Sequence, residues 1–326
     1  MDIGDYLPLL LPLLAVPLVC WSGSRLYPAL ASWLTAVSSV VLAVGAALAL
    51  VLFTIAGLAG LSVVARFGHL STATLRSADV TDLPLDSVAG ALLAAMVIAA
   101  LVTGLSRARA IGRAYRLTRQ SGSTRELLVL HDQQPIAHAV PGRPGRIIVS
   151  TSMLGPAERR ALLAHERAHL TRSHHLFVAV VDVMSAANPL LRPLRKVVRY
   201  TTERWADEIA AGQIGDRAVV AKAVGKAALA TKAAADRGSI TGSITGQISM
   251  AAAAGEVPRR VAALLIAPPA RRLRLILTSP TGMFAVVAIG ITVASAGFAI
   301  EAAGDLHHVL ALAYLGRYPR RADTPR

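Results

Sequence analysis

Four long apolar segments constrain the fold of this chain more than any other feature of its sequence. They cover residues 6–21, 31–63, 88–105 and 283–300. An α-helix rises 1.5 Å per residue, so about 20 apolar residues span the hydrocarbon core of a bilayer. The whole chain is 54% hydrophobic and only 16% charged, which is unlike an ordinary soluble domain. The sequence therefore predicts a mostly α-helical membrane protein with about four transmembrane helices.

The basic residues indicate how these helices are oriented. They are concentrated between residues 106 and 280, where they clearly outnumber the acidic residues. Lys and Arg accumulate in the cytoplasmic segments that flank membrane helices, so we expect this segment to face the cytoplasm. The first apolar run follows the acidic start MDIGDY instead of the basic region of a secretory signal, so we expect it to be retained. Four crossings then place both termini outside the plasma membrane of a multi-pass protein.

The spans divide the chain into four predicted regions. These are a three-helix transmembrane region (1–105), a cytoplasmic domain (106–280), a C-terminal transmembrane helix (281–301) and a short extracytoplasmic tail (302–326). The cytoplasmic domain begins with three β-like runs, ELLVLH, PIAHAV and RIIVS, of which the last two are separated by the turn sequence PGRPG. We expect a small hairpin or meander here, followed by helices, so the domain is predicted to be α+β.

Three helical patterns follow in this domain. The first begins at Pro156, the second covers residues 176–194 and the third begins near Arg199. Residues 227–256 are rich in Ala, Gly, Ser and Thr and contain the repeat GSITGSITG. For that stretch we expect a mobile region beside at least one Ala-rich helix.

Net charge and cysteine content narrow the possible functions. A formal net charge of +15 is compatible with nucleic-acid binding, but no basic stripe interleaved with aromatic residues is present. We therefore do not expect direct binding to DNA or RNA. Cys20 is the single cysteine, which excludes an intramolecular disulfide and a multi-thiolate metal site. Any metal must be held by histidine and carboxylate side chains.

A polar cluster in the segment LLAHERAHL points to such a site. His165, Glu166 and His169 share one face of the predicted helix with the apolar Leu162, so they face the protein interior. Two histidines four residues apart can bind one zinc ion, and the glutamate between them can act as a general base without being a ligand. Zinc polarises a peptide carbonyl and activates water, while the glutamate carries its proton to the leaving amine. This pattern is typical of a zinc peptidase with one catalytic zinc ion.

A catalytic zinc ion also needs a third protein ligand and an open position. Glu203 on a later helix is the preferred candidate, with Asp207 one turn further placed to hydrogen-bond a ligand histidine. His174 and His175 are alternative ligands, but they follow His169 so closely that the helix would have to end sharply. They can equally serve as donors to the oxyanion of the tetrahedral intermediate or as helix caps.

Several motifs together make the chain resemble a known family. They are PGRPGRIIVSTSML, LLAHERAHL, NPLL, ERWADEIA and VPRRVAALL, which lie in order between residues 141 and 266. On these motifs the chain resembles the integral-membrane zinc peptidases of the β-lactam and methicillin resistance sensor-transducer (antirepressor) family, relatives of the HtpX and CAAX prenyl protease group. The resemblance implies a gluzincin-like peptidase domain facing the cytoplasm, with His165, His169 and Glu203 as zinc ligands and Glu166 as general base.

The same resemblance implies a role in signalling. These relatives relieve repression by a small winged-helix DNA-binding repressor, so we expect the substrate to be a cytoplasmic regulatory protein of that kind. The sensor-transducers also carry a penicillin-binding domain after their last span, whereas residues 301–326 contain no Ser-x-x-Lys motif. We therefore do not expect direct β-lactam sensing, and a stimulus would act through the spans, the outer loop at residues 65–86 or another protein.

Two other functions remain open at this point. An HtpX-like protease would remove damaged membrane proteins with broad specificity. A non-catalytic transducer would use zinc structurally and change its partner by binding alone.

Overall fold

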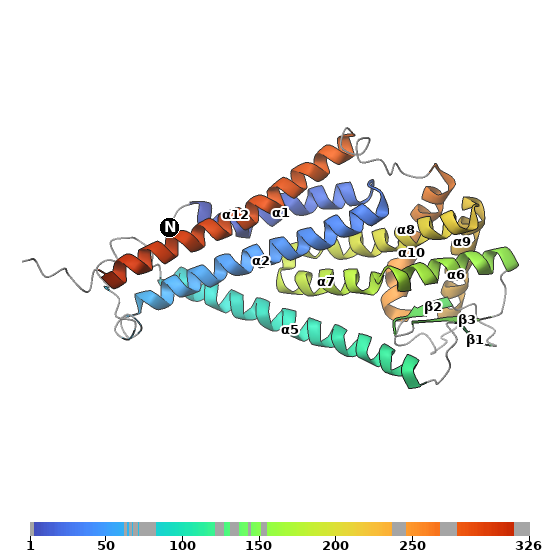
Figure 1. Ribbon diagram of the computed structural model, residues 1–326, viewed down its shortest axis with the longest axis horizontal. Helices are drawn as coiled ribbons and strands as arrows, with labels where there is room; N and C mark the ends of the chain where they lie inside the picture. Colours follow the sequence, from blue (N-terminus) through green and yellow to red (C-terminus); the bar gives the residue numbers. More distant parts are fainter. Residues whose placement is uncertain are drawn as a thin grey trace, which may run out of the picture.

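The computed structural model describes most of the chain and is predominantly helical (Figure 1). The described residues are 3–61, 64, 67, 71, 83–120, 127–130, 137–142, 145–150, 155–236, 246–267 and 279–315. Within them, four helices are long and apolar enough to cross a membrane: α1 (Ile3–Gly23), α2 (Pro28–Gly60), α5 (Leu83–Gln120) and α12 (Pro280–Leu315). The prediction of about four candidate transmembrane helices is confirmed, and most of the predicted outer loop lies outside the described residues.

Two of these helices extend by more than a dozen residues beyond the apolar segments that predicted them. The arginine-rich stretch after residue 105 continues α5 as far as Gln120. The last helix, α12, runs past Ile300 to Leu315, so much of the predicted tail is helical. A formed helix propagates by adding one hydrogen bond per residue, and neither extension contains a proline to stop it. Apolar length therefore marked the membrane-compatible part of each helix but not its ends.

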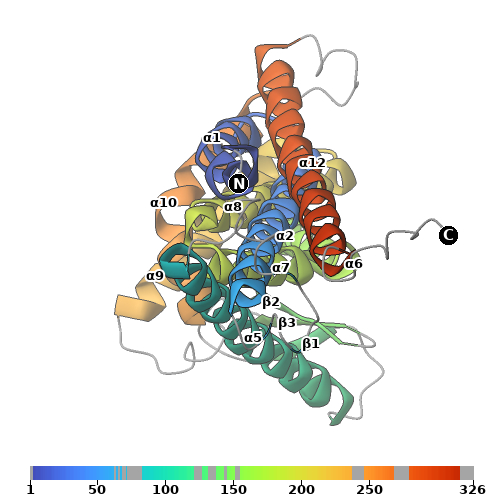
Figure 2. The ribbon, with the colours of Figure 1, turned by 90° about the vertical axis from the view of Figure 1, so that its left-hand side faces the viewer.

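The candidate spans pack on one another and on the helices of the central domain. α2 contacts α1, α12 and α5, and it lies between α5 and the other two in the end-on view (Figure 2). Fully buried side chains join α1 and α2 to α7 (His174–Ala187) and α8 (Leu194–Ile214). They include Val19, Leu42, Val181, Leu194 and Val198. This shared core connects the candidate spans α1 and α2 directly to helices of the central domain.

A three-stranded sheet lies at the far end of the molecule from the span ends that join α2 to α5 (Figure 1). Its strands are β1 (Leu127–Leu130), β2 (Ala137–Val140) and β3 (Arg146–Ser150), in the order β1-β3-β2. β2 and β3 form the expected antiparallel hairpin. The alternative of a meander is wrong, because β1 pairs in parallel with β3. Side-chain alternation identifies strands but does not specify their partners.

The helices of the central domain are α6 (Pro156–Thr171), α7, α8, α9 (Arg217–Asp236) and α10 (Gly246–Leu265). The predicted helix at residues 176–194 is divided, because α7 ends at Ala187 and a short 3-10 turn, Pro189–Leu191, follows. α8 begins at Leu194, earlier than predicted. Pro189 at the start of this turn and Pro193 just after it explain the division, since proline cannot donate the hydrogen bond that a helix interior needs. The GSITGSITG repeat lies almost wholly in residues 237–245, outside the described residues.

Candidate metal centre

Helix α6 carries the HERAH motif and is anchored at its N-terminal end. Pro156 occupies its first turn, and the Gly155 amide donates to Glu158 Oε2 at 3.1 Å. Lys226 of α9 donates to both oxygens of the same carboxylate at 2.8 Å, and this pairing lowers the pKa of Glu158 to about 2. Small buried alanines let α8 and α9 approach closely. These contacts with α8 and α9 fix the position of the helix that carries the motif.

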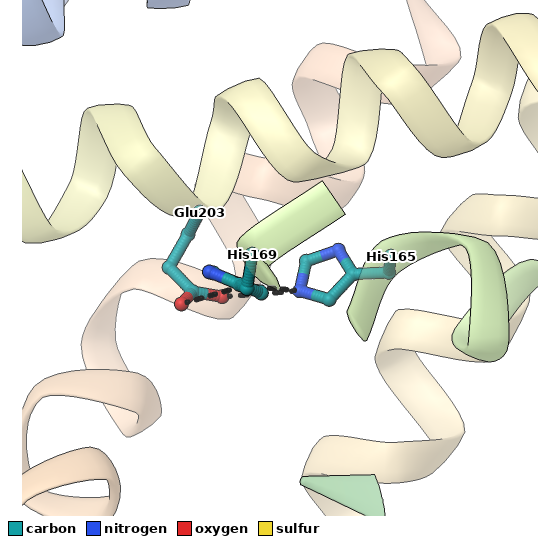
Figure 3. Close-up of side chains that lie close together, drawn as sticks. All are labelled: His165, His169 and Glu203. Carbon is teal, nitrogen blue, oxygen red and sulfur yellow. Dashed lines mark hydrogen bonds and ion pairs between the residues drawn. The ribbon is translucent and has the colours of Figure 1, made fainter. Parts of the chain in front are cut away.

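The structure brings together the three residues predicted as metal ligands (Figure 3). His165 Nε2 and His169 Nε2 are 3.1 Å apart, and each lies 3.4 Å from an oxygen of Glu203. In a tetrahedral zinc site with ligand distances of about 2.0–2.1 Å, the ligand atoms are about 3.3–3.4 Å apart. The spacing and the two-nitrogen, one-oxygen donor set therefore fit a zinc ion.

Asp207 orients the first of these histidines. Its Oδ1 lies 3.0 Å from Nδ1 of His165, the ring nitrogen on the side away from the ligand group. Asp207 is fully buried, and although burial opposes its ionisation, the charge of Arg260 keeps its pKa well below the usual range. A charged acceptor at Nδ1 places the proton there and leaves Nε2 free to bind a metal. The structure thus places Asp207 where the sequence predicted a supporting carboxylate.

Arg260 of α10 is a site residue that was not predicted from the sequence. It is buried and bridges two carboxylates, with Nη2 2.8 Å from Asp207 Oδ1 and Nη1 2.9 Å from Glu203 Oε2. A signal was present in the sequence, because Arg260 shares a helix face with the fully buried Leu264, four residues later. A charged residue at such a position is normally paired in the interior. Its partners could not be identified without the fold.

His174 contacts His169, the second candidate ligand histidine. α6 and α7 are joined by a sharp turn in which Ser173 adopts a left-handed conformation with φ of 51°. This turn places Nδ1 of the buried His174 3.0 Å from Nδ1 of His169. His174 therefore contacts the ring nitrogen opposite the ligand group, a position that suits a supporting partner and not an alternative ligand or an oxyanion donor. Its neighbour His175 is also outside the group of three.

Glu166 lies between the two histidines and is held by the sheet. The backbone amide of Ala139 in β2 donates to Glu166 Oε2 at 2.8 Å. Burial raises the pKa of this carboxyl to about 7. A group with such a pKa gains and loses a proton readily near neutral pH, as a general base must.

The two candidate ligand histidines differ in the pKa of their imidazole rings. Burial disfavours the charged form of His165, but hydrogen bonds that its ring donates to Asp207 and Glu203 outweigh this effect and raise the pKa of His165 to about 10. At His169 burial dominates and lowers the pKa to about 4. A metal ion that binds this group must therefore displace a proton from His165, so that binding weakens as the pH falls.

Comparison with known proteins agrees with the chemistry of this group. Residues 107–265 match the model of Peptidase family M48. No curated protein and no solved structure matched the chain. The matched segment begins within α5, ends with α10 and includes every residue of the candidate metal centre. Peptidases of this family depend on a metal ion, usually zinc. Residues 107–265 thus resemble Peptidase family M48, and with the four candidate spans this likeness supports a membrane-associated metallopeptidase.

Proposed function

We propose that this protein is a membrane-embedded, zinc-dependent endopeptidase that hydrolyses peptide bonds of a cytoplasmic regulatory protein. The observation that carries the proposal is the convergence of His165, His169 and Glu203 on one point, with Glu166 directly after His165 in the sequence. Three ligands leave a fourth position open, which distinguishes a catalytic zinc site from a closed structural one.

The roles of the residues follow from this arrangement. A zinc ion held by the three side chains would act as a Lewis acid on the scissile carbonyl and lower the pKa of water. Glu166 takes the proton of the attacking water and delivers it to the leaving amine. Asp207 and His174 hold the ring orientations of the two histidines, and Arg260 holds the carboxylate of Glu203.

The sheet beside α6 supports a peptide as substrate. Within the described strands, β2 pairs with β3 along one edge, and at its other edge the Ala139 amide points to Glu166. An extended peptide that aligns with this edge would bring its carbonyl groups next to the general base, because unpaired strand edges bind extended chains through backbone hydrogen bonds.

The identity of the substrate is the more specific part of the proposal. We infer a small winged-helix repressor, since the motifs of the chain resemble those of antirepressor peptidases and the basic flanks favour a cytoplasmic active site. Cleavage of this repressor would switch on its target genes. The rival functions are broad removal of damaged membrane proteins and signalling without catalysis.

Glu166→Gln separates catalysis from metal binding. The glutamine keeps an oxygen that can accept from Ala139, but it cannot act as a base. Purified full-length protein in detergent should contain equal zinc with or without this substitution, and cleavage of candidate repressors should fall by at least about a hundredfold. Equal cleavage by the variant would overturn the catalytic role of Glu166. Normal signalling by the variant in cells would instead favour the non-catalytic transducer.

Two further measurements test the ligand set and the substrate. Glu203→Ala should lower the zinc content, and unchanged stoichiometry would place the third ligand elsewhere. Cleavage of a folded repressor at one bond, with little cleavage of an unfolded control protein, is the expected result. Broad cleavage of the unfolded protein alone would favour the quality-control function.

A further inference from the structure

Helix α5 carries one continuous stripe of side chains that is apolar in its first part and basic in its second. The stripe consists of exposed side chains at helical spacing, namely Ile98, Val102, Leu105, Arg109, Arg113, Arg116 and Arg119. Successive residues of an α-helix are rotated by about 100°, so all of these side chains point within about 60° of one direction. We call its four arginines the basic stripe.

Arg107 shows which way the stripe faces. It lies on the side of α5 opposite the stripe, because it is nine residues after Ile98 and two residues before Arg109. There its guanidinium group forms an ion pair with Asp182, a fully buried residue of α7. Since Arg107 faces the central domain, the stripe faces away from it.

The apolar part of the stripe is left largely uncovered by the described elements. Ile98, Val102 and Leu105 are 61%, 62% and 53% exposed. The most apolar stretch of α5 is only 6% buried, whereas that of α2 is 50% buried. Towards its C-terminal end α5 also diverges from α2 (Figure 1). On a candidate span, such an exposed aliphatic face is suited to contact with lipid chains.

In a bilayer that covers the apolar part of the stripe, the basic stripe begins beside the headgroups. With a rise of 1.5 Å per residue, Arg109 lies about 6 Å beyond Leu105 and Arg116 about 16 Å beyond it. The headgroup layer of one leaflet is about 5–8 Å thick, and its potential extends about 8 Å further at physiological ionic strength. Long arginine side chains can also bend back towards this layer. The basic stripe is therefore within reach of headgroups.

No negative charge within α5 compensates the basic stripe. Residues 87–120 contain no Asp or Glu, so the arginines cannot pair with a carboxylate one turn away on the same helix. In the part of the chain that the structure describes, the four arginines also form no ion pair with another element. The charge of the stripe thus complements an anionic partner. A lipid headgroup fits better than an acidic protein, because the stripe continues directly from side chains suited to contact with lipid chains.

We propose that the basic stripe of α5 is a binding surface for anionic phospholipid headgroups. Arginine binds phosphate oxygens through strong, charge-assisted hydrogen bonds. Clusters of basic residues directly beside a membrane span attract anionic lipids. This surface is separate from the proposed peptidase function, because lipid binding requires neither zinc nor Glu166.

Native mass spectrometry of the full-length protein in neutral detergent tests this proposal. Dioleoylphosphatidylglycerol and dioleoylphosphatidylcholine, which share their acyl chains and differ in headgroup charge, are titrated separately. We expect the anionic lipid to bind at least about fivefold more tightly. Higher concentrations of ammonium acetate should reduce this preference, because salt screens exposed charges. Equal affinity for the two lipids would overturn the proposal.

Paired substitutions locate the lipid on the molecule. Arg113→Gln combined with Arg116→Gln should weaken phosphatidylglycerol binding about tenfold or more. Arg113→Lys combined with Arg116→Lys keeps both charges and should retain the preference for the anionic lipid.

The control is Arg160→Gln combined with Lys222→Gln, which removes the same charge from exposed positions on α6 and α9. It should bind both lipids like the wild type. If this control lost as much affinity as the α5 glutamine variant, the effect would come from net charge and the assignment to α5 would be refuted.

Discussion

Arg260 of α10 donates two hydrogen bonds to Asp207 of α8, from Nε to Oδ2 and from Nη2 to Oδ1, each 2.8 Å long. Its third nitrogen, Nη1, lies 2.9 Å from Glu203 Oε2. One guanidinium group thus holds both the candidate third ligand and the carboxylate that orients His165. A residue far along the sequence therefore helps to determine the geometry of the metal centre.

Replacing Arg260 with lysine should weaken zinc binding. A lysine ammonium cannot make the paired contacts to Asp207 and also contact Glu203. Loss of such supporting contacts typically lowers metal affinity by about 10–100-fold. Competition with a chromogenic chelator measures this affinity. Arg259→Lys is the matched control, because Arg259 is exposed and lies over the Tyr200 ring instead. Unchanged affinity in Arg260→Lys would show that the bridge is dispensable.

His174→Ala should affect zinc affinity more than zinc stoichiometry. The alanine removes the group that contacts His169 Nδ1, so the ring of His169 loses its orientation but remains a ligand. We expect binding to be about tenfold weaker or more, with one zinc ion still bound at saturation. His175→Ala serves as control and should behave like the wild type. If His175→Ala lost zinc and His174→Ala did not, the assignment of the two residues would be reversed.

Glycine and valine at position 173 should have different effects on the stability of the folded protein. A left-handed conformation costs a residue with a Cβ atom about 1–2 kcal/mol, and a β-branched residue suffers most. Ser173→Gly should therefore leave the unfolding midpoint unchanged or raise it, whereas Ser173→Val should lower it. Thermal unfolding followed by circular dichroism compares the two variants. A Ser173→Val variant as stable as wild type would argue against the left-handed turn.

The ion pair between Glu158 and Lys226 should stabilise the folded protein less at acidic pH. The hydrogen bond with Lys226 lowers the pKa of Glu158 from 4.5 to about 2 in the folded protein. A lowered pKa contributes stability that is fully present above pH 4.5 and is lost as the pH falls towards 2. The difference in unfolding midpoint between wild type and Lys226→Met should therefore be larger at pH 6 than at pH 3. Lys222→Met is a milder control, because Lys222 lies 3.3 Å from the same carboxylate and is more exposed. A difference that did not change with pH would exclude this origin.

Much of the fold followed from local patterns. Apolar length identified the four candidate spans, since a helix must satisfy its own backbone in a bilayer. Helical periodicity likewise placed His165, Glu166 and His169 on one face, because residues three and four apart are neighbours on a helix. The helix ends, the parallel pairing of β1 with β3 and the left-handed turn at Ser173 were not predicted. These features depend on contacts between segments that are distant in sequence or on one backbone torsion.

The sequence by itself determined the membrane-compatible helices, the polar face of α6 and the ligand chemistry available without thiolates. Only the tertiary structure decided which residues complete the site. It set Glu203 against the two histidines, Arg260 across two carboxylates and His174 behind His169. The spacing of residues along one helix is set by its periodicity, whereas contacts between α6, α8 and α10 depend on how their buried faces pack.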